Sequence, residues 1–173
     1  EVLLMSDRVD EWMMSHLTEF ADKQLQSITR GDLDLGKLDD EETKKAQEES
    51  EKEMAGLVER IKTALGEDVK EVRFTHRLTD SPACVVSDDN DMSSQMQKLM
   101  ESVGQAAPEA KPVFELNPEH QLVKHLNDEQ DEDKFSQWSH VLLDQALLAE
   151  RGTLKDPTGF VTRLNKLMLE LSK

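Results

Sequence analysis

The sequence predicts an α+β fold with a long connecting helix, a small three-stranded sheet accompanied by an amphipathic helix, and two C-terminal helices. Two kinds of pattern lead to this prediction. Several stretches carry apolar residues at helical spacing, and three short apolar stretches bounded by turn residues are typical of strands. Glycine, proline and aspartate separate these stretches. With 173 residues, the chain is long enough to bury a core of ordinary size.

Composition excludes several classes of protein. The chain has 21 Lys and Arg against 37 Asp and Glu, a formal net charge of −16, which repels phosphate backbones and anionic lipids, so we expect no nucleic acid or membrane as partner. The single cysteine, Cys84, excludes an intramolecular disulfide framework and any Cys-based zinc site, and it indicates a reducing compartment. The chain opens at Glu1 without an initiator Met, so we expect it to be a piece of a longer protein.

Residues 1–36 are expected to form a unit of their own that ends in a linker. Turn-forming residues separate its short segments, and two glycines mark its end. Its predicted elements are a buried strand over 2–5, a helix capped by Ser6 or Asp7 and running to Leu17, one strand over 20–28, and a linker over 30–36.

Residues 37–173 are expected to form a second domain. Its longest helical signal covers 39–65, and the second half of that signal carries one apolar stripe that ends at Gly66. The other predicted elements before the C-terminal helices are strands over 69–76, 83–86 and 111–116, a helix over 92–103 and a short helix over 119–126.

Two strong helices close the chain, one over 131–154 and one that starts at Pro157 with Asp156 as its N-cap. Together they carry about ten large apolar side chains, more than one antiparallel hairpin can cover. Two arrangements satisfy this pattern. Both helices pack on the sheet of their own chain, or two copies of the hairpin form an intermolecular four-helix bundle about a two-fold axis. The pattern alone favours neither.

Catalytic and metal-binding patterns are absent from the sequence. It contains no G-x-S-x-G, Gly-rich phosphate loop, H-E-x-x-H or Cys-x-x-Cys. His120 and His125 are five residues apart, which places them on different helix faces. The acidic run 88–91 lacks the oxygen spacing of a cation loop and is interpreted as a helix cap. We therefore expect no enzyme activity, catalytic residue, metal or cofactor, and we interpret Cys84 as a packed thiol of raised pKa.

An apolar stripe lies on the helix predicted over 92–103. Such stripes usually belong to a core, yet three methionines in nine residues also suit a surface that adapts to partners of varied shape. Trp12 could add a second apolar contact. Two functions stay open: a dimeric module that holds other proteins on this stripe, and a dimeric scaffold or adaptor in which the stripe is core. The stripe consists of Met92, Met96, Leu99, Met100 and Val103.

Four stretches of the chain resemble one known family. The sequence is similar to the C-terminal part of the ninety-kilodalton heat-shock chaperones, and most closely to the bacterial branch of that family, the high-temperature protein G branch. The stretches follow the family's order and span nearly the whole chain. They are 6–12 (SDRVDEW), 77–86 (RLTDSPACVV), 114–120 (FELNPEH) and 142–152 (LLDQALLAERG).

The resemblance implies that residues 1–36 are the end of the middle domain and that 37–173 are the dimerisation domain. The family's dimer is held by its last two helices, which implies the intermolecular bundle. ATP and Mg bind in an N-terminal domain of the family, so no nucleotide site or ATPase is expected here. The residues that match the client-binding positions are Trp12, Met92, Met96, Leu99 and Met100. The expected dimer interface comprises Leu142, Leu147, Phe160, Leu164, Leu167, Met168 and Leu171.

The implied function is a homodimerisation and client-contact module of an ATP-dependent chaperone that assists the folding of non-native proteins. Its expected partners are a second copy of the chain and non-native client proteins. The sequence 169–173 differs from the acidic peptide with which eukaryotic cytosolic members recruit tetratricopeptide co-chaperones. Such partners are therefore not expected, and a bacterial cytoplasmic location is.

Overall fold

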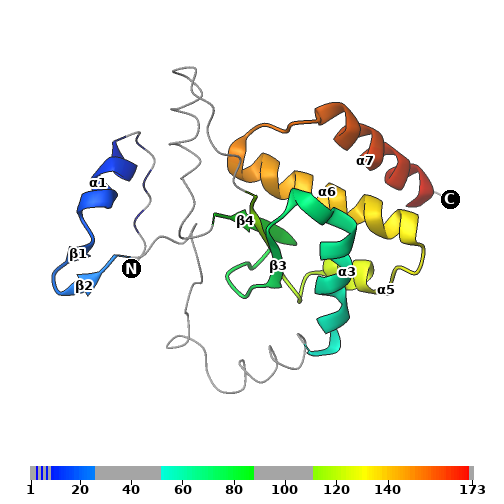
Figure 1. Cartoon of the computed structure of the whole chain (residues 1–173), viewed down its shortest axis with the longest axis horizontal. Coiled ribbons are helices and arrows are strands. Elements are labelled where there is room, and N and C mark those ends of the chain that lie inside the picture. The colour runs from blue at the N-terminus through cyan, green and yellow to red at the C-terminus, as the bar shows by residue number, and fades with distance from the viewer. Residues whose placement is uncertain are drawn as a thin grey trace.

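A computed structural model of the chain describes residues 3, 5, 7, 9–25, 52–87 and 111–171. These residues contain both helices and sheets, as predicted for an α+β protein (Figure 1). The predicted linker, the first half of the long helix and the helix over 92–103 lie outside them. The elements are α1 (Asp10–His16), β1 (Glu19–Phe20), β2 (Lys23–Gln24), α3 (Ala55–Leu65), the 3-10 turn η1 (Gly66–Asp68), β3 (Glu71–Phe74), β4 (Ala83–Val86), β5 (Val113–Leu116), α5 (Gln121–Asp128), α6 (Glu132–Arg151) and α7 (Pro157–Leu171).

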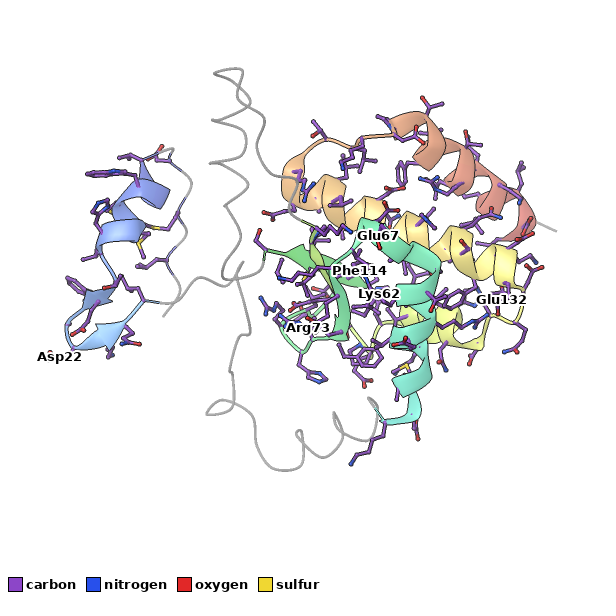
Figure 2. All side chains as sticks on the ribbon, in the orientation of Figure 1. Asp22, Lys62, Glu67, Arg73, Phe114 and Glu132 are labelled. Carbon is purple, nitrogen blue, oxygen red and sulfur yellow. The ribbon has the colours of Figure 1, made fainter. Side chains whose placement is uncertain are left out.

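The segment that follows α1 is a two-stranded hairpin, so the single strand predicted over 20–28 is wrong for 20–25, the part that the structure describes. Strands β1 and β2 pair antiparallel, with Phe20 opposite Lys23. Ala21 and Asp22 have positive φ angles of 50° and 60°, the geometry of a two-residue hairpin turn, and Asp22 marks its tip (Figure 2). No glycine stands at this reversal, so nothing in the pattern indicated it.

Helix α1 begins later than predicted. Its N-cap residue is Val9, which makes no side-chain capping bond. The backbone N–H of Asp7 instead donates to Asp10 Oδ2 at 2.8 Å, so the carboxylate of Asp10 holds the turn before the helix. Asp7 as the cap is therefore wrong, and Ser6 lies outside the described residues.

The buried strand predicted over 2–5 is wrong for the two of its residues that the structure describes. Leu3 and Met5 lie outside regular secondary structure, and both side chains are exposed. A run of four apolar residues does not specify a neighbouring strand or a cover for its side chains. Burial needs both.

The main sheet has the strand order β3-β5-β4. Strand β5 runs parallel to β3 and antiparallel to β4, so Val72 and Val85 flank Phe114 on either side. The three strands were predicted: β4 has the predicted bounds, whereas β3 and β5 are shorter than the predicted 69–76 and 111–116. At the start of β5, Pro112 has no N–H to give to the ladder, but its carbonyl accepts the N–H of Lys70 at 2.8 Å.

Helices α3 and α6 cover one face of this sheet, with α6 between the sheet and α7 (Figure 1). The predicted stripe on α3 is confirmed, since Leu57, Ile61 and Leu65 are buried and Gly66 forms the C-cap. Phe114 on the central strand is fully buried (Figure 2). The core therefore joins residues from both helices to the central strand.

Helix α7 has the N-cap predicted at Asp156, whereas α6 ends at Arg151, before the end predicted at 154. The Asp131 side chain accepts the N–H groups of Asp133 and Lys134 at the start of α6. Gly152 ends α6 at φ 73°, a left-handed conformation that favours glycine. At the start of α7, Gly159 N–H donates to Asp156 Oδ1 at 2.9 Å. These caps account for the sharp bounds of both helices.

Gly159→Ala should loosen the first turn of α7. A Cβ at this position would overlap the Asp156 carboxylate, whose Cγ lies 2.8 Å away, and so would displace the N-cap. Loss of such a cap costs about 1–2 kcal/mol, so the amides of this turn should exchange hydrogen roughly 5–30-fold faster. Gly56→Ala on α3 is the matched control, because a Cβ there meets nothing within 4 Å. Equal exchange in both variants would contradict the cap.

Candidate dimer and client surfaces

Helix α6 has two different neighbours on its two sides. Phe135, Leu142 and Ala146 point into the core that α6 shares with the sheet and α3. On its other side α6 packs against α7, where Arg163 Nη2 lies 2.7 Å from Asp144 Oδ2. A second ion pair between the same helices joins Lys134 to Glu170 at 3.6 Å. Helix α7 therefore forms the outermost layer of the domain.

Helix α7 leaves a stripe of apolar side chains uncovered. Leu167 is the one residue that is buried within α7 as the structure describes it. The side chains of Met168 and Leu171 are 59% and 66% exposed, and Val161 is also exposed. These residues recur at spacings of seven and three, which places them on one face of the helix. A contiguous exposed apolar face of this kind marks an interaction site.

The structure divides the predicted dimer residues into two groups. Leu142 and Leu167 are buried within the single chain, and Leu147 is half-buried against the core. The other four, which lie on α7 and are half-buried or exposed, are the ones a partner could reach; they are Phe160, Leu164, Met168 and Leu171.

Trp12 is 67% exposed on α1. Its ring centroid lies 4.7 Å from that of His16, and His16 Nδ1 lies 2.9 Å from the Trp12 carbonyl oxygen. Met13 and Phe20, which are close in sequence, are exposed as well. The described N-terminal residues therefore present apolar side chains around this tryptophan. The other predicted client residues, Met92, Met96, Leu99 and Met100, lie outside the described residues.

The segment 88–110 leaves and re-enters the domain at adjacent strands. The last residue of β4, Val86, pairs with the first residue of β5, Val113. Lys111, at the point of return, forms an ion pair with Glu67. The hydrogen bond and the charge of Lys111 lower the pKa of Glu67 below its ordinary value. The residues on either side of the segment are thus held at one end of the sheet and beside η1.

A buried carboxylate that the sequence analysis missed lies on the central strand. Glu115 is 1% exposed, and its Oε1 lies 2.7 Å from Arg73 Nη2 and its Oε2 2.9 Å from Arg77 Nε. Two residues on, the Asn117 amide donates to three carbonyls of the loop 78–81. Two of the four stretches that carried the resemblance therefore meet here. An acidic residue inside an apolar strand was the signal available in the sequence.

Cys84 faces this carboxylate. Its Sγ lies 3.6 Å from Glu115 Oε2. Burial, reinforced by the negative charge of Glu115, raises the pKa of the Cys84 thiol to about 12 from its ordinary 9.0. The thiol therefore stays protonated at neutral pH, in agreement with the predicted packed cysteine.

The Cys84 thiol should alkylate slowly in the folded chain. At pH 8 a rise of the pKa from 9.0 to about 12 leaves roughly a thousand-fold less thiolate, which is the reactive form. The rate with iodoacetamide should still increase tenfold between pH 9 and pH 10. The same chain unfolded in urea is the control, and its rate should level off above pH 9. Equal rates in the two states at pH 8 would contradict the raised pKa.

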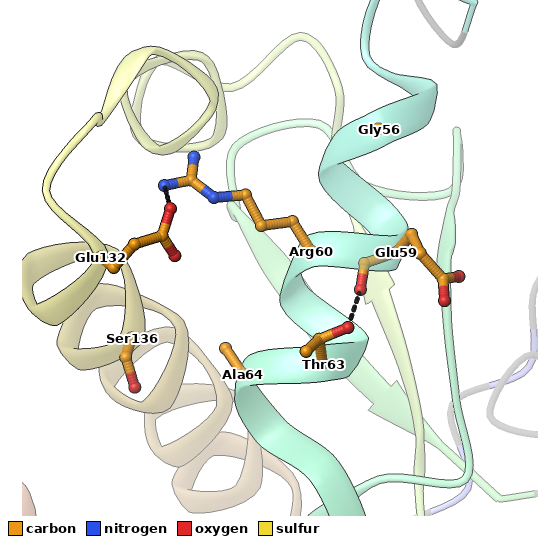
Figure 3. Close-up of a pocket in the computed structure, with 7 residues that line it drawn as sticks. All are labelled: Gly56, Glu59, Arg60, Thr63, Ala64, Glu132 and Ser136. Carbon is orange, nitrogen blue, oxygen red and sulfur yellow. Dashed lines mark hydrogen bonds and ion pairs between the residues drawn. The ribbon is translucent and has the colours of Figure 1, made fainter.

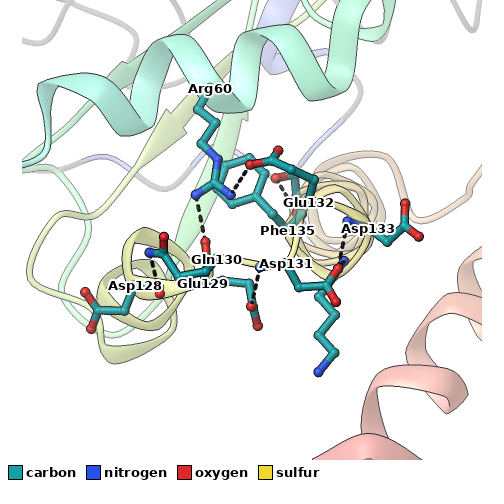
Figure 4. A network of polar contacts seen from close by, with 10 residues as sticks. Arg60, Asp128, Glu129, Gln130, Asp131, Glu132, Asp133 and Phe135 are labelled. Atoms are coloured by element: carbon teal, nitrogen blue, oxygen red, sulfur yellow. Dashed lines mark hydrogen bonds and ion pairs between the residues drawn. The ribbon is translucent and has the colours of Figure 1, made fainter.

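An open groove of about 510 Å³ lies between α3 and α6 (Figure 3). Arg60 crosses one end of it, where its guanidinium donates to Glu132 Oε1 at 2.7 Å and to the Glu129 carbonyl at 2.8 Å (Figure 4). The same guanidinium lies 3.7 Å from the centroid of the Phe135 ring. These contacts tie α3 to the start of α6, and they give Arg60 a structural role.

The histidines of the described domain have local partners. His120 Nδ1 accepts the N–H of Leu122 at 3.1 Å and so caps α5, and His140 Nδ1 lies 2.7 Å from the Ser136 carbonyl oxygen. Within the described ranges, no group of three or more His, Cys, Asp or Glu side chains could hold a metal ion. In the same ranges, every helix is too short or too polar to cross a bilayer.

Comparison with known proteins defines the class of this chain. The family model described as "Hsp90 protein" matches residues 1–172, and the chain belongs to the Hsp90 family, as the resemblance implied. It is 97% identical over its whole length to the chaperone protein HtpG of Pseudoalteromonas translucida and 67% identical to that of Colwellia psychrerythraea. HtpG of Idiomarina loihiensis is 65% identical over 98% of the chain. The chain spans 26–27% of the length of these relatives.

Proposed function

We propose that this chain is the homodimerisation and client-contact module of an ATP-dependent Hsp90-family chaperone that assists the folding of non-native proteins. The observation that supports a dimer is the uncovered apolar stripe of α7. Full burial of one such side chain would stabilise the paired state by about 1.5–3 kcal/mol. A two-fold axis would bring the stripe of a second copy against the first. We place the α6–α7 hairpins of two copies in an intermolecular four-helix bundle.

Charge supports this choice of surface. Two copies of a chain with net charge −16 repel each other over most of their surfaces. Helix α7 is an exception, because it carries Arg163 and Lys166 against a single acidic residue, Glu170. Self-association therefore meets the least repulsion where the apolar stripe lies. Added salt should strengthen the dimer, because it screens the repulsion between the two copies.

The client surface is proposed to comprise Trp12 and the predicted stripe of the segment 88–110. The exposure of Trp12 supports the first part. The attachment of the segment to the adjacent ends of β4 and β5 supports the second, because it ties a candidate binding segment to a rigid base. Aromatic and thioether side chains suit clients of varied sequence.

The nucleotide chemistry is assigned to other parts of the protein. We propose that ATP and Mg act there, and that this module contributes a permanent joint between two chains. A joint raises the effective concentration of each attached domain for its counterpart. The boundary between residues 1–36 and 37–173, and the cytoplasmic location, stay predictions.

The mass of the chain in solution tests the dimer. Light scattering over a dilution series should give twice the chain mass of 19.7 kDa at micromolar concentration, with conversion to single chains on dilution. A concentration-independent mass of one chain would overturn the proposal.

Client holding can be tested apart from dimerisation. Trp12→Ala, and separately Met96→Asn with Leu99→Asn, should weaken the suppression of aggregation of a chemically denatured test protein, with thermal stability and dimer mass unchanged. Leu169→Ala is the control, because it removes an equally exposed apolar side chain outside the proposed client surface. If the Trp12 and Met96/Leu99 variants suppressed aggregation as well as the unchanged chain does, the client surface would be wrong. The alternative function, a dimeric scaffold or adaptor, would then be favoured.

A further inference from the structure

We propose that α7 is a conditionally docked helix. In an unpaired chain it leaves α6 as a unit while α3, the sheet and α6 stay folded, and pairing with a second copy holds it in place. The inference rests on the proposed dimer for its second half. The release of α7 from α6 in the single chain does not depend on the dimer, and three structural features support it.

The main core does not depend on α7. The buried cluster contains Phe135, Leu142, Leu143 and Ala146 of α6, together with residues of α3, α5 and the sheet. In the part of the chain that the structure describes, no residue of α7 belongs to this cluster. Leu167 is buried, but outside it. Release of α7 therefore leaves the larger cluster intact, as expected for a satellite contact.

Buried polar atoms oppose the docking of α7. Gln137 Oε1 on α6 and Arg163 Nε and Glu170 Oε2 on α7 are buried and have no hydrogen-bond partner among the described residues. Each of these atoms gives up water when the helices dock and receives no hydrogen bond in return. The ion pairs from Arg163 to Asp144 and from Lys134 to Glu170 offset part of this cost, but they are partly solvated.

The connection to α7 allows the helix to leave α6 without disturbing the fold of α6. Gly152 ends α6 in a left-handed conformation, and residues 152–156 link the two helices. Helix α7 has its own cap at Asp156, and Thr162 Oγ1 donates to the Thr158 carbonyl within it. These local bonds alone leave a helix of 15 residues marginal in water, so its backbone amides become open to exchange once its contacts with α6 are broken.

Pairing couples to docking because the apolar stripe is correctly placed only when α7 lies on α6. A second copy that binds the docked form shifts the population toward it. Part of the free energy of pairing is then used to dock α7. The measured dimer affinity should therefore be weaker than that of the same surface on a helix that is already docked in the unpaired chain.

Hydrogen exchange of the full chain, measured above and below the dimer dissociation constant, tests the proposal. In the unpaired chain, the amides of 160–171 should exchange at least 100-fold faster than those of 135–147. In the paired chain, their protection should rise by at least 30-fold. Equal protection of α6 and α7 in the unpaired chain would overturn the proposal.

Gln137→Leu tests the polar cost directly. It removes the buried, unpartnered Oε1 of a half-buried side chain and leaves an apolar side chain of similar volume, so protection of α7 in the unpaired chain should rise about 5–10-fold and dimer affinity by a similar factor. Gln145→Leu is the matched control, because Gln145 is exposed on the same helix. Identical α7 protection in the two variants would contradict the argument.

The outcomes separate the two proposals. If the mass stays that of one chain at all concentrations, the dimer fails, and the exchange of α7 relative to α6 still decides whether the helix releases. If a dimer forms but α7 is as protected as α6 after dilution, the dimer stands and conditional docking is overturned.

Discussion

Met168→Asp separates the proposed dimer into single chains. Met168 is 59% exposed in the single chain, so the substitution costs little there. In the paired state it would bury two carboxylates near a two-fold axis, and the desolvation of unpaired charges is costly. We expect the dissociation constant to rise at least 100-fold, measured by light scattering across a dilution series.

Lys166→Gln is the control for this variant. It changes the charge of α7 by the same amount at an exposed position on the side of the helix away from Met168, so it should change the dissociation constant only a few-fold. Leu164→Asp should act like Met168→Asp. Leu167→Asp is a poorer probe, because Leu167 is buried against its own chain and the variant would lose its α6–α7 contact as well. An unchanged dimer mass for Met168→Asp would contradict the proposed four-helix bundle.

Glu115→Gln should be among the most destabilising single changes in the domain. The carboxylate is buried between Arg73 and Arg77, and Arg77 is itself only 11% exposed. Removing the negative charge leaves two guanidinium groups with like charge and little water around them. Breaking a buried pair in this way costs about 3–5 kcal/mol, measured as a shift of the urea midpoint at constant slope.

Glu119→Gln is the comparison for this second prediction. Glu119 pairs with Lys124 at 2.9 Å, but both side chains are at least half exposed, so its loss should cost about 0–1 kcal/mol. If the midpoints of the two variants moved by the same amount, the buried network would not be the stabilising element that its geometry indicates.

The helices that bear the core and the proposed interface could be predicted because their signals are local. The stripe on α3 recurs within one segment, and the predicted cap Asp156 stands next to the helix that it bounds. The outer face of α7 followed from the same periodicity. Whether that face is covered by its own sheet or by a partner depends on the position of α6, which no local pattern determines.

The parts that could not be predicted depend on contacts between distant residues or on unusual backbone. Arg73 and Glu115 are 42 residues apart, and no spacing rule links them. The turn at Ala21 and Asp22 adopts positive φ without glycine, so it carries no signal of the usual kind. The cap of α1 was misassigned because several acidic residues near its start could all accept a backbone N–H.

The pairing of Val86 with Val113 has a consequence for how this family can vary. Because these two strand ends are paired, they fix where the connecting segment starts and where it ends. A connecting segment of almost any length can join them, since the free-energy cost of closing a loop grows only slowly with its length. The segment between these valines can therefore change in sequence or in length while the pairing of β4 with β5 is maintained. The sequence of this proposed client segment can therefore change without a change in the fold of the domain.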